Sequence, residues 1–550
     1  MKCLVCVIFV ILLSAVIYAE ERPLVSIEDG LVRGTHKTSY HGRKYAAFEG
    51  IPYAQPPIQS LRFRDPQPVI PWQGVLDANS YYKCLQLQLQ GMRVAGQEDC
   101  LYLNVYVPQE KLQSNEKLDV IVHVHGAGFM LGDPNDMSGP SKLMDRDVVY
   151  VNFNYRLGPL GFYSTGDSIL PGNYGLKDQV FVLQWIQKNI EKFGGNPDSV
   201  TLTGSSAGGA SVHLHYFSLL SEGLFHKGWV SSGSALNPWV IKDDPSLNAK
   251  ILAKEVGCQS DSVPQLLGCL RERSALQIQE AVKATYKDWL VPLSPFGPTI
   301  EPFAATSFLT AHPYSLLVSN VVANVPVMFV ATTGEGLLPS IVYYERLSEL
   351  NEKYELLFPF MLEYSSYNQT FQEDITEKIS DYYFEYDPLE QANFEKLVKL
   401  CSQRLYDNGI EKSIKLQSKI TTSDVFFMRM GTGSLIPGLE HLGVPHAGDT
   451  IFYYDIVLNN TTLSTREVKM KDVLIDMMVN FASTGKPAVR DISFKPNVEN
   501  NELQYLLVKG PDDIKMKHGE TLGGLTFWDS LGLNEDQNLY SGDINYNSNT

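Results

Sequence analysis

Residues 193–208 read FGGNPDSVTLTGSSAG, and they place Ser206 at the centre of a G-x-S-x-G motif. A serine hydroxyl is a weak nucleophile at its own pKa, so it has to be held exposed beside a base, and a sharp turn from strand to helix does this. Gly204 and Gly208 suit such a turn, because side chains there would collide with the neighbouring strand or helix. An ordinary glycine-rich turn is the alternative, and the flanking sequence has to decide between the two.

The flanking sequence predicts the order helix, turn, strand, nucleophile and helix. Val182, Ile186 and Ile190 lie four residues apart, which is the helical period, and two glycines end the run. Residues 196–198 (NPD) then predict a turn, and the β-branched residues of 200–203 predict a short strand. Small residues after Ser206 predict a helix that starts close to the sheet, with its free N–H groups directed at developing charge.

A second segment can supply backbone hydrogen-bond donors to an oxyanion. The alternating run 120–124 predicts a strand, and His125-Gly126-Ala127-Gly128-Phe129 follows it. A strand that ends in small residues can present successive N–H groups, so we assign Ala127 and Gly128, together with Ala207, as the donors. If the peptide at Ala127 needs a positive φ, its methyl group is strained there.

These segments and EDCLYLNVYVP at residues 98–108 resemble the signature segments of the type-B carboxylesterase and cholinesterase family. The likeness extends along the chain and is strongest to secreted insect carboxylesterases. It implies an α/β-hydrolase fold, with a large, mostly parallel, twisted central sheet flanked by helices and carrying long helical insertions. We expect one such domain over residues 20–550, with helical insertions at 244–287 and 347–406. The further matching segments are LRF at 61–63, NYRLGPLGF at 154–162, GNYGLKDQ at 172–179 and SSGSALNPW at 231–239.

The resemblance implies two catalytic partners for Ser206. Family triads follow the chain order serine, acid, histidine, and Glu335 follows an apolar strand predicted at 327–331. The segment GVPHAGDTIFYY is similar to the family's G-x-x-H-x-x-D pattern and places His446 and Asp449 in register. His446 would be the general base and Glu335 would orient it. A solvated loop carboxylate is the alternative for Glu335.

The same resemblance implies pocket and scaffold residues. Trp239 and Phe296 are similar to acyl-pocket positions, with ordinary core aromatics as the alternative. Cysteines 84 and 100 and cysteines 258 and 269 resemble loop-closing disulfides. Cys3 and Cys6 lie in the leader described below, so Cys401 is the cysteine left over. The residues of the expected disulfides and of two expected structural ion pairs are Cys84–Cys100, Cys258–Cys269, Arg62–Glu98 and Arg156–Asp178.

The amino terminus predicts secretion to the extracellular space. Residues 1–19 combine Lys2, an apolar run and small residues before Glu20, which is typical of a signal peptide. Sequons at Asn368, Asn459 and Asn460 predict glycosylation and agree with secretion. We expect no membrane span elsewhere, and a mobile tail after about residue 532.

Charge and composition exclude other classes of function. A net charge of −17 argues against nucleic acid as a partner. The histidine pairs 123/125 and 213/215 lack a third ligand with suitable spacing, so we expect no metal. There is no P-loop and no dinucleotide fingerprint, so we expect no cofactor.

The leading hypothesis is a secreted serine carboxylesterase that hydrolyses neutral, apolar esters, such as odorant, dietary, hormone or xenobiotic esters, through an acyl-enzyme. Cholinesterases place glutamate before the nucleophile and a tryptophan between the first paired cysteines. Here Ser205 precedes Ser206 and residues 84–100 contain no tryptophan, which argues against acetylcholine. The alternative is a slow or inert member of the same fold that sequesters a ligand or acts in adhesion.

Overall fold

The computed structural model describes residues 22–109, 117–286, 293–457, 462–498, 502–519 and 521–533. The predicted signal peptide at 1–19, the sequons at Asn459 and Asn460, and nearly all of the predicted mobile tail lie outside these ranges. Within them, no helix is both long enough and apolar enough to span a bilayer.

An eleven-stranded sheet forms the centre of the described chain, in the order β16-β15-β14-β13-β12-β11-β9-β10-β8-β4-β3. The strands from β15 to β10 in this order pair in parallel, whereas β16 at one edge and β8, β4 and β3 at the other pair antiparallel. The predicted mostly parallel sheet is confirmed. Its strands are β3 (Thr35–Thr38), β4 (Lys44–Pro52), β8 (Tyr102–Val107), β9 (Leu118–Val124), β10 (Val149–Phe153), β11 (Gly195–Ser205), β12 (Lys227–Ser231), β13 (Val327–Thr332), β14 (Val425–Met430), β15 (Gln504–Gly510) and β16 (Asp513–His518).

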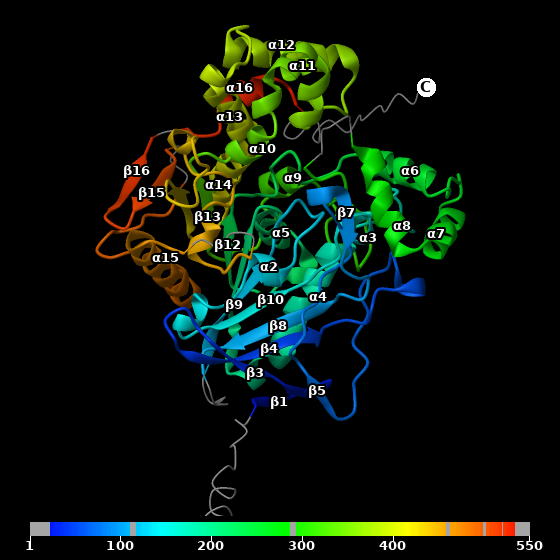
Figure 1. Cartoon of the computed structure of the whole chain (residues 1–550), viewed down its shortest axis with the longest axis vertical. Coiled ribbons are helices and arrows are strands. Elements are labelled where there is room, and N and C mark those ends of the chain that lie inside the picture. The colour runs from blue at the N-terminus through cyan, green and yellow to red at the C-terminus, as the bar shows by residue number, and fades with distance from the viewer. Residues whose placement is uncertain are drawn as a thin grey trace, which may run out of the picture.

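Two small sheets and a set of helices complete the described structure (Figure 1). The small sheets contain β1 (Leu24–Ile27), β2 (Gly30–Arg33) and β5 (Val75–Asp77), and β6 (Gln86–Gln88) and β7 (Arg93–Ala95). The α-helices are α2 (Pro134–Met137), α3 (Gly158–Phe162), α4 (Tyr174–Asn189), α5 (Ala207–His215), α6 (Pro245–Glu255), α7 (Val263–Glu272), α8 (Ala275–Glu280), α9 (Pro313–Val318), α10 (Leu337–Ile341), α11 (Leu347–Met361), α12 (Gln369–Ile379), α13 (Phe394–Ser402), α14 (Asn408–Ile420), α15 (Thr465–Thr484) and α16 (Leu525–Ser530).

The sheet is buried on both faces, because alternate side chains of each strand point to opposite sides. In β9, Ile121 packs into a cluster with Leu474 of α15, whereas Val120 and Val122 join the larger cluster that includes Val212 of α5. Helices therefore cover both faces of the central strands, and the functional groups can gather only at a strand end.

One predicted local feature is right in part. Residues 196–198 do turn, because the Asp198 N–H donates to Asn196 Oδ1 over 3.1 Å, but the turn lies inside the strand, since β11 already begins at Gly195. Gly195 pairs with Leu118 and Val200 pairs with Val120, so five residue steps along β11 lie opposite two residue steps along β9. Asn196, Pro197 and Asp198 therefore belong to a bulge within the strand.

The two predicted helical insertions are confirmed as helical segments. Helices α6, α7 and α8 occupy the first, and α11, α12 and α13 occupy most of the second. Figure 1 shows both groups on the side of the molecule away from β1 and β5.

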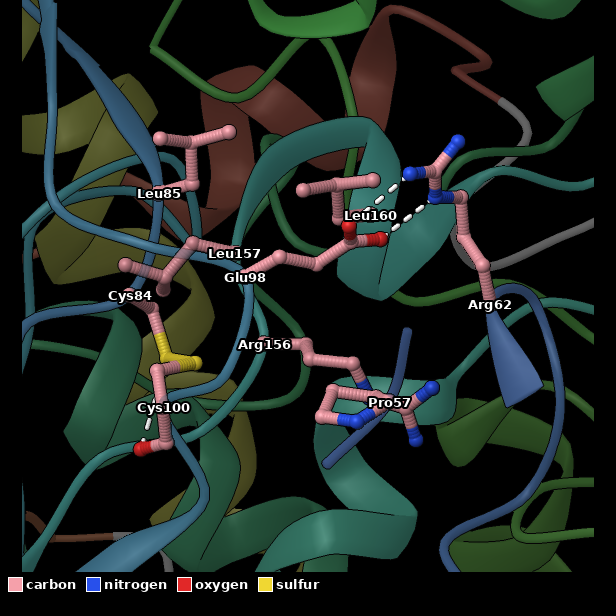
Figure 2. Close-up of a pocket in the computed structure, with 9 residues that line it drawn as sticks. All are labelled: Pro57, Arg62, Cys84, Leu85, Glu98, Cys100, Arg156, Leu157 and Leu160. Carbon is pink, nitrogen blue, oxygen red and sulfur yellow. Dashed lines mark hydrogen bonds and ion pairs between the residues drawn. A yellow bond between two sulfur atoms is a disulfide. The ribbon is translucent and has the colours of Figure 1, made fainter. Parts of the chain in front are cut away.

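Two disulfides and two ion pairs brace the loops. Cys84 and Cys100 are bonded, as are Cys258 and Cys269, whereas Cys401 is free and buried. Figure 2 shows the guanidinium group of Arg62 facing the carboxylate of Glu98, beside the disulfide between residues 84 and 100. The Arg62 Nη2 atom donates to Glu98 Oε2 over 2.8 Å.

The second ion pair is almost completely buried. Arg156 donates to Asp178 from Nε over 2.8 Å and from Nη2 over 2.7 Å, and the Arg156 backbone N–H donates to the same carboxylate. The side chains are 4% and 0% exposed. This bidentate pair ties the loop after β10 to α4, so its loss leaves a charge without a partner in the interior.

We predict that Asp178→Ala lowers the free energy of unfolding by about 3–5 kcal/mol, because Arg156 then remains buried and uncompensated. Urea unfolding followed by circular dichroism measures this. The control is Asp374→Ala, which removes a surface pair with Lys378 whose side chains are both 49% exposed; its expected cost is under about 1 kcal/mol. Equal losses in the two variants would contradict the prediction.

Candidate active site

Ser206 lies at the turn between β11, which ends at Ser205, and α5, which begins at Ala207. Its backbone has φ 61° and ψ −124°, a conformation that residues other than glycine rarely adopt. Ser205 and Ala207 are buried, whereas Ser206 is partly exposed. The turn therefore presents the hydroxyl of Ser206 above a buried backbone, as the sequence predicts for a nucleophile.

Glycines make this turn possible. A Cβ atom on Gly204 would overlap the backbone of Gly208, and one on Gly208 would overlap the carbonyl oxygen of Val124. Gly209 likewise lies against the backbone of Ser231. The steric reason inferred from the motif thus applies to both of its glycines, since strand and helix approach closer than any side chain permits.

Glu335 and His446 are joined by a short hydrogen bond between Oε2 and Nδ1, at 2.6 Å. Their loops run side by side, because the N–H of Gly334 donates to the carbonyl of Val444 over 2.8 Å. The side chains of Glu335 and His446 are 0% and 6% exposed. The alternative interpretation of Glu335 as a solvated carboxylate is therefore wrong.

Two further donors hold the Glu335 carboxylate. Its Oε1 atom accepts from the hydroxyl of Ser232 over 2.7 Å and from the N–H of Thr332 over 2.6 Å. Burial alone raises the pKa of Glu335, but the facing His446 ring and these hydrogen bonds outweigh it and hold the pKa below its usual value. Glu335 therefore stays ionised and can favour a cationic imidazole.

The segment 231–233 connects Ser206 to this pair. The N–H of Ser206 donates to the carbonyl of Ser231 over 2.8 Å, and the next residue, Ser232, donates to Glu335. A Cβ atom on Gly233 would overlap the carbonyl oxygen of Ser206. No hydrogen bond joins the Ser206 hydroxyl to His446 in this structure, and such contacts often tighten only when substrate is bound.

The predicted oxyanion donors lie beside the nucleophile. A Cβ atom on Gly126 would be 2.9 Å from the Cβ of Ser206, which places the 126–128 loop against it. Ala127 and Gly128 both have positive φ, 76° and 63°. Ala127 therefore carries the strain that its methyl group implies. Within the described part of the chain, the N–H groups of Ala127, Gly128 and Ala207 donate to no protein acceptor.

The two predicted pocket aromatics are buried. Trp239 is 2% exposed, donates from Nε1 to the carbonyl of Leu405 over 2.8 Å, and lies with its ring centroid 6.3 Å from that of Phe129. It is therefore next to the 126–128 loop of predicted oxyanion donors, which we call the oxyanion loop. Phe296 is 3% exposed and follows Leu293, whose carbonyl contacts Gly128. The assignment of these two residues to an acyl pocket stays a prediction.

His123 and His125, one of the two histidine pairs tested as possible metal ligands, have other contacts. His123 Nδ1 lies 3.0 Å from Thr203 Oγ1, and the His125 ring stacks on Tyr155 at 4.5 Å. Burial lowers the pKa of His123 to about 3 and that of His125 to about 4. Among the described residues, no group of three or more His, Cys, Asp or Glu side chains could hold a metal ion.

Asn368, the one predicted glycosylation site in these ranges, is exposed and caps α12.

The sequence pattern aligned Asp449 with the family's G-x-x-H-x-x-D segment but did not predict the environment of its side chain. Asp449 is 1% exposed, and neither carboxylate oxygen has a hydrogen-bond partner on another described residue. Burial, and next the charge of Glu335, raise the pKa of Asp449 to about 7. The second missed residue, Ser232, lies in the quoted segment SSGSALNPW, but only the folded chain brings it to Glu335.

We predict that Asp449 makes folding less favourable as pH rises. The pKa of Asp449 in the folded protein lies above the unfolded value of 3.8, so the folded state favours the protonated carboxyl. The contribution of Asp449 to folding stability is therefore fully present below about pH 4 and is lost as pH rises to about 7. Between pH 5 and pH 8 the wild type should lose about 2–3 kcal/mol of folding free energy relative to Asp449→Asn, in which the side chain cannot ionise. Urea unfolding of both proteins at both pH values measures this, and a constant difference would contradict it.

Comparisons with known proteins identify the family of this chain. The model of the carboxylesterase family matches residues 21–528. A carboxylic ester hydrolase from Bombus ignitus is 35% identical over 540 residues, covering 94% of this chain and 96% of that protein. Venom carboxylesterase-6 from Apis mellifera is 34% identical over 539 residues, covering 94% and 95%.

A solved structure shows the same fold. Juvenile hormone esterase from Manduca sexta, crystallised with OTFP covalently attached, matches with a TM-score of 0.82 and 26% identity, covering 93% of this chain and 99% of that chain. The expected α/β-hydrolase fold and the likeness to insect carboxylesterases are thus confirmed. This chain belongs to the carboxylesterase family and is similar along nearly its whole length to a carboxylic ester hydrolase.

Proposed function

We propose that this protein is a secreted serine carboxylesterase that hydrolyses neutral, apolar esters through an acyl-enzyme, with Ser206, Glu335 and His446 as its triad in one catalytic domain. The observation that carries the proposal is the buried 2.6 Å bond between Glu335 and His446, linked through residues 231–233 to the strained turn at Ser206. Nucleophile, base and orienting acid are the three parts that acyl transfer by serine requires.

In the first half-reaction, His446 takes the proton of the Ser206 hydroxyl as its oxygen bonds to the ester carbonyl carbon. The carbonyl oxygen becomes an oxyanion, which the N–H groups of Ala127, Gly128 and Ala207 would stabilise. The ester C–O bond then breaks, and His446 gives its proton to the leaving alcohol. Ser206 now carries the acyl group.

In the second half-reaction, His446 takes a proton from water, and the hydroxide oxygen bonds to the acyl carbon. The tetrahedral intermediate collapses, the proton returns to the Ser206 oxygen, and the carboxylic acid leaves. Glu335 favours the cationic imidazole that forms in both halves. The covalent attachment of OTFP in the Manduca sexta esterase structure supports a covalent step in this family.

The surroundings of Ser206 support an apolar substrate. Buried aromatic side chains, Trp239 and Phe129, lie beside the oxyanion loop, and Ser205 supplies no charge before the nucleophile. An uncharged ester is therefore favoured over a cationic one. The apolar leader sequence, the two disulfides and the exposed sequon at Asn368 support secretion.

We predict that Ser206→Ala lowers kcat by about 10³-fold or more on p-nitrophenyl esters from acetate to octanoate. Release of p-nitrophenol measures this, with the neighbouring Ser205→Ala as the matched control that should retain most activity. Retained turnover in Ser206→Ala would remove Ser206 from its role. In the wild type, one equivalent of p-nitrophenol followed by near arrest would favour the sequestering alternative.

We also predict that Glu335→Gln lowers kcat by about 10³- to 10⁴-fold while the protein stays folded, because a neutral amide can neither fix the imidazole tautomer nor stabilise the imidazolium. The amide oxygen can still accept from Ser232 and Thr332, which preserves the loop. Steady-state kinetics and thermal melting measure the two effects. A fully active Glu335→Gln variant would exclude Glu335 as the acid.

A further inference from the structure

The segment between α13 and α14 is a π-helical turn, Gln403–Asp407. Such turns are rare, and they often occur at functional sites because they insert a residue into a helix and redirect its side chains. This one contains Tyr406, which is 3% exposed. The proposed mechanism uses no residue of this segment.

Tyr406 lies against the proposed general base. The ring centroid of Tyr406 is 4.4 Å from that of the His446 imidazole, and the two planes are inclined by 35°. Glu335 holds the same imidazole at Nδ1 only. A single hydrogen bond at one atom leaves the ring free to swing about that bond, so a flat side chain on one face restricts the motion that the bond permits.

The π-helical turn is fastened to the segment that carries Trp239. The indole N–H of Trp239 donates to the carbonyl of Leu405 over 2.8 Å, and the Asn237 amide donates to the carbonyl of Tyr406 over 2.8 Å. A Cβ atom on Gly409 would be 2.6 Å from the carbonyl oxygen of Leu236, so the lack of a side chain there permits the close approach.

The turn is also fastened to the sheet. Asp407 and Arg429 of β14 form a buried two-point ion pair, with the Arg429 Nη2 atom 3.1 Å from Asp407 Oδ2. Arg404 donates from Nε to the carbonyl of Leu362 over 2.8 Å. Tyr406 is thus held from both sides of the chain, which is more constraint than hydrophobic packing alone supplies.

We propose that Tyr406 is a positioning residue for His446: clamped through Leu405 and its own carbonyl to Trp239 and Asn237, its ring keeps the imidazole in the orientation required for proton transfer with Ser206. The inference rests on the proposed function. Misplacement of a catalytic group by about 1 Å can cost about 100-fold in rate, so a ring that limits its motion affects turnover more than substrate binding. The face of the Tyr406 ring also favours the imidazolium that forms during proton transfer.

The test compares Tyr406→Leu with Tyr406→Phe on the same ester panel. Tyr406→Leu should lower kcat by about 10- to 100-fold on every ester, with KM changed by less than about threefold. Tyr406→Phe, which keeps the ring, should restore most of kcat. The control is Tyr163→Leu, a buried tyrosine whose hydroxyl donates to the carbonyl of Ala249; it should cost stability without this selective loss of kcat.

A second variant tests the clamp without removing Tyr406. Trp239→Phe deletes the N–H donor to Leu405 but keeps an aromatic ring, and it should lower kcat uniformly by about three- to tenfold across acyl lengths. A loss confined to the longer acyl chains would assign Trp239 to the pocket wall alone and overturn the clamp. This variant decides the question if Tyr406→Leu does not fold.

The outcomes separate the two proposals. If Ser206→Ala is inactive and Tyr406→Leu keeps wild-type kcat, the positioning role is wrong and the esterase proposal stands. If Ser206→Ala is active, the esterase mechanism itself is wrong. If Tyr406→Leu and Tyr163→Leu lower kcat equally, the contribution of Tyr406 is core packing, and the positioning role is again overturned.

Discussion

The backbone conformation of Ser206 is the constraint on which the rest of the site depends. A serine at φ 61° and ψ −124° is strained by on the order of 1–3 kcal/mol, so the surroundings have to impose it. The Ser206 N–H donates to Ser231, and its carbonyl accepts from Ala210 of α5. Gly204 and Gly208 permit these contacts, because strand and helix meet there backbone to backbone. Relaxation of the turn would withdraw the hydroxyl from the oxyanion loop.

The buried charge of Glu335 is the second constraint, and it explains why this site is built from several strands. An ionised carboxylate at 0% exposure is unfavourable unless its oxygens are satisfied. Here three donors from three places satisfy it: Ser232 after β12, the Thr332 N–H at the end of β13, and His446. Asp449, close in sequence to His446, finds no such donors on other residues that the structure describes, and its pKa rises instead. The same depth of burial thus gives one ionised and one readily protonated acid.

The sequence predicted the parts of this structure that local rules or a family pattern determine. The four-residue spacing of Val182, Ile186 and Ile190 predicted a helix where α4 lies, although α4 begins earlier, at Tyr174, and ends at Asn189. The spacing around Ser206 predicted the strand and the following helix. It did not predict the bulge at Asn196, because the partner strand sets that register. Nor could it find Ser232 beside Glu335, or the π-helical turn at Tyr406, since a five-residue turn is too short to set a periodicity of its own in the sequence. These features arise from contacts between segments far apart in the chain.

Sheet order explains how distant residues can form one site. Strands β14, β13, β12, β11 and β9 are consecutive neighbours, and all of them run parallel. The segments after them carry, in that order, His446, Glu335, Ser232, Ser206 and the oxyanion loop, so separations of many residues become steps between adjacent strands. Long helical insertions could then vary without disturbing the chemistry. Tyr406 is an exception to this independence of insertions and chemistry, because its ring, at the end of the second insertion, contacts the His446 imidazole. Changes in that helical layer should therefore alter turnover as well as substrate preference.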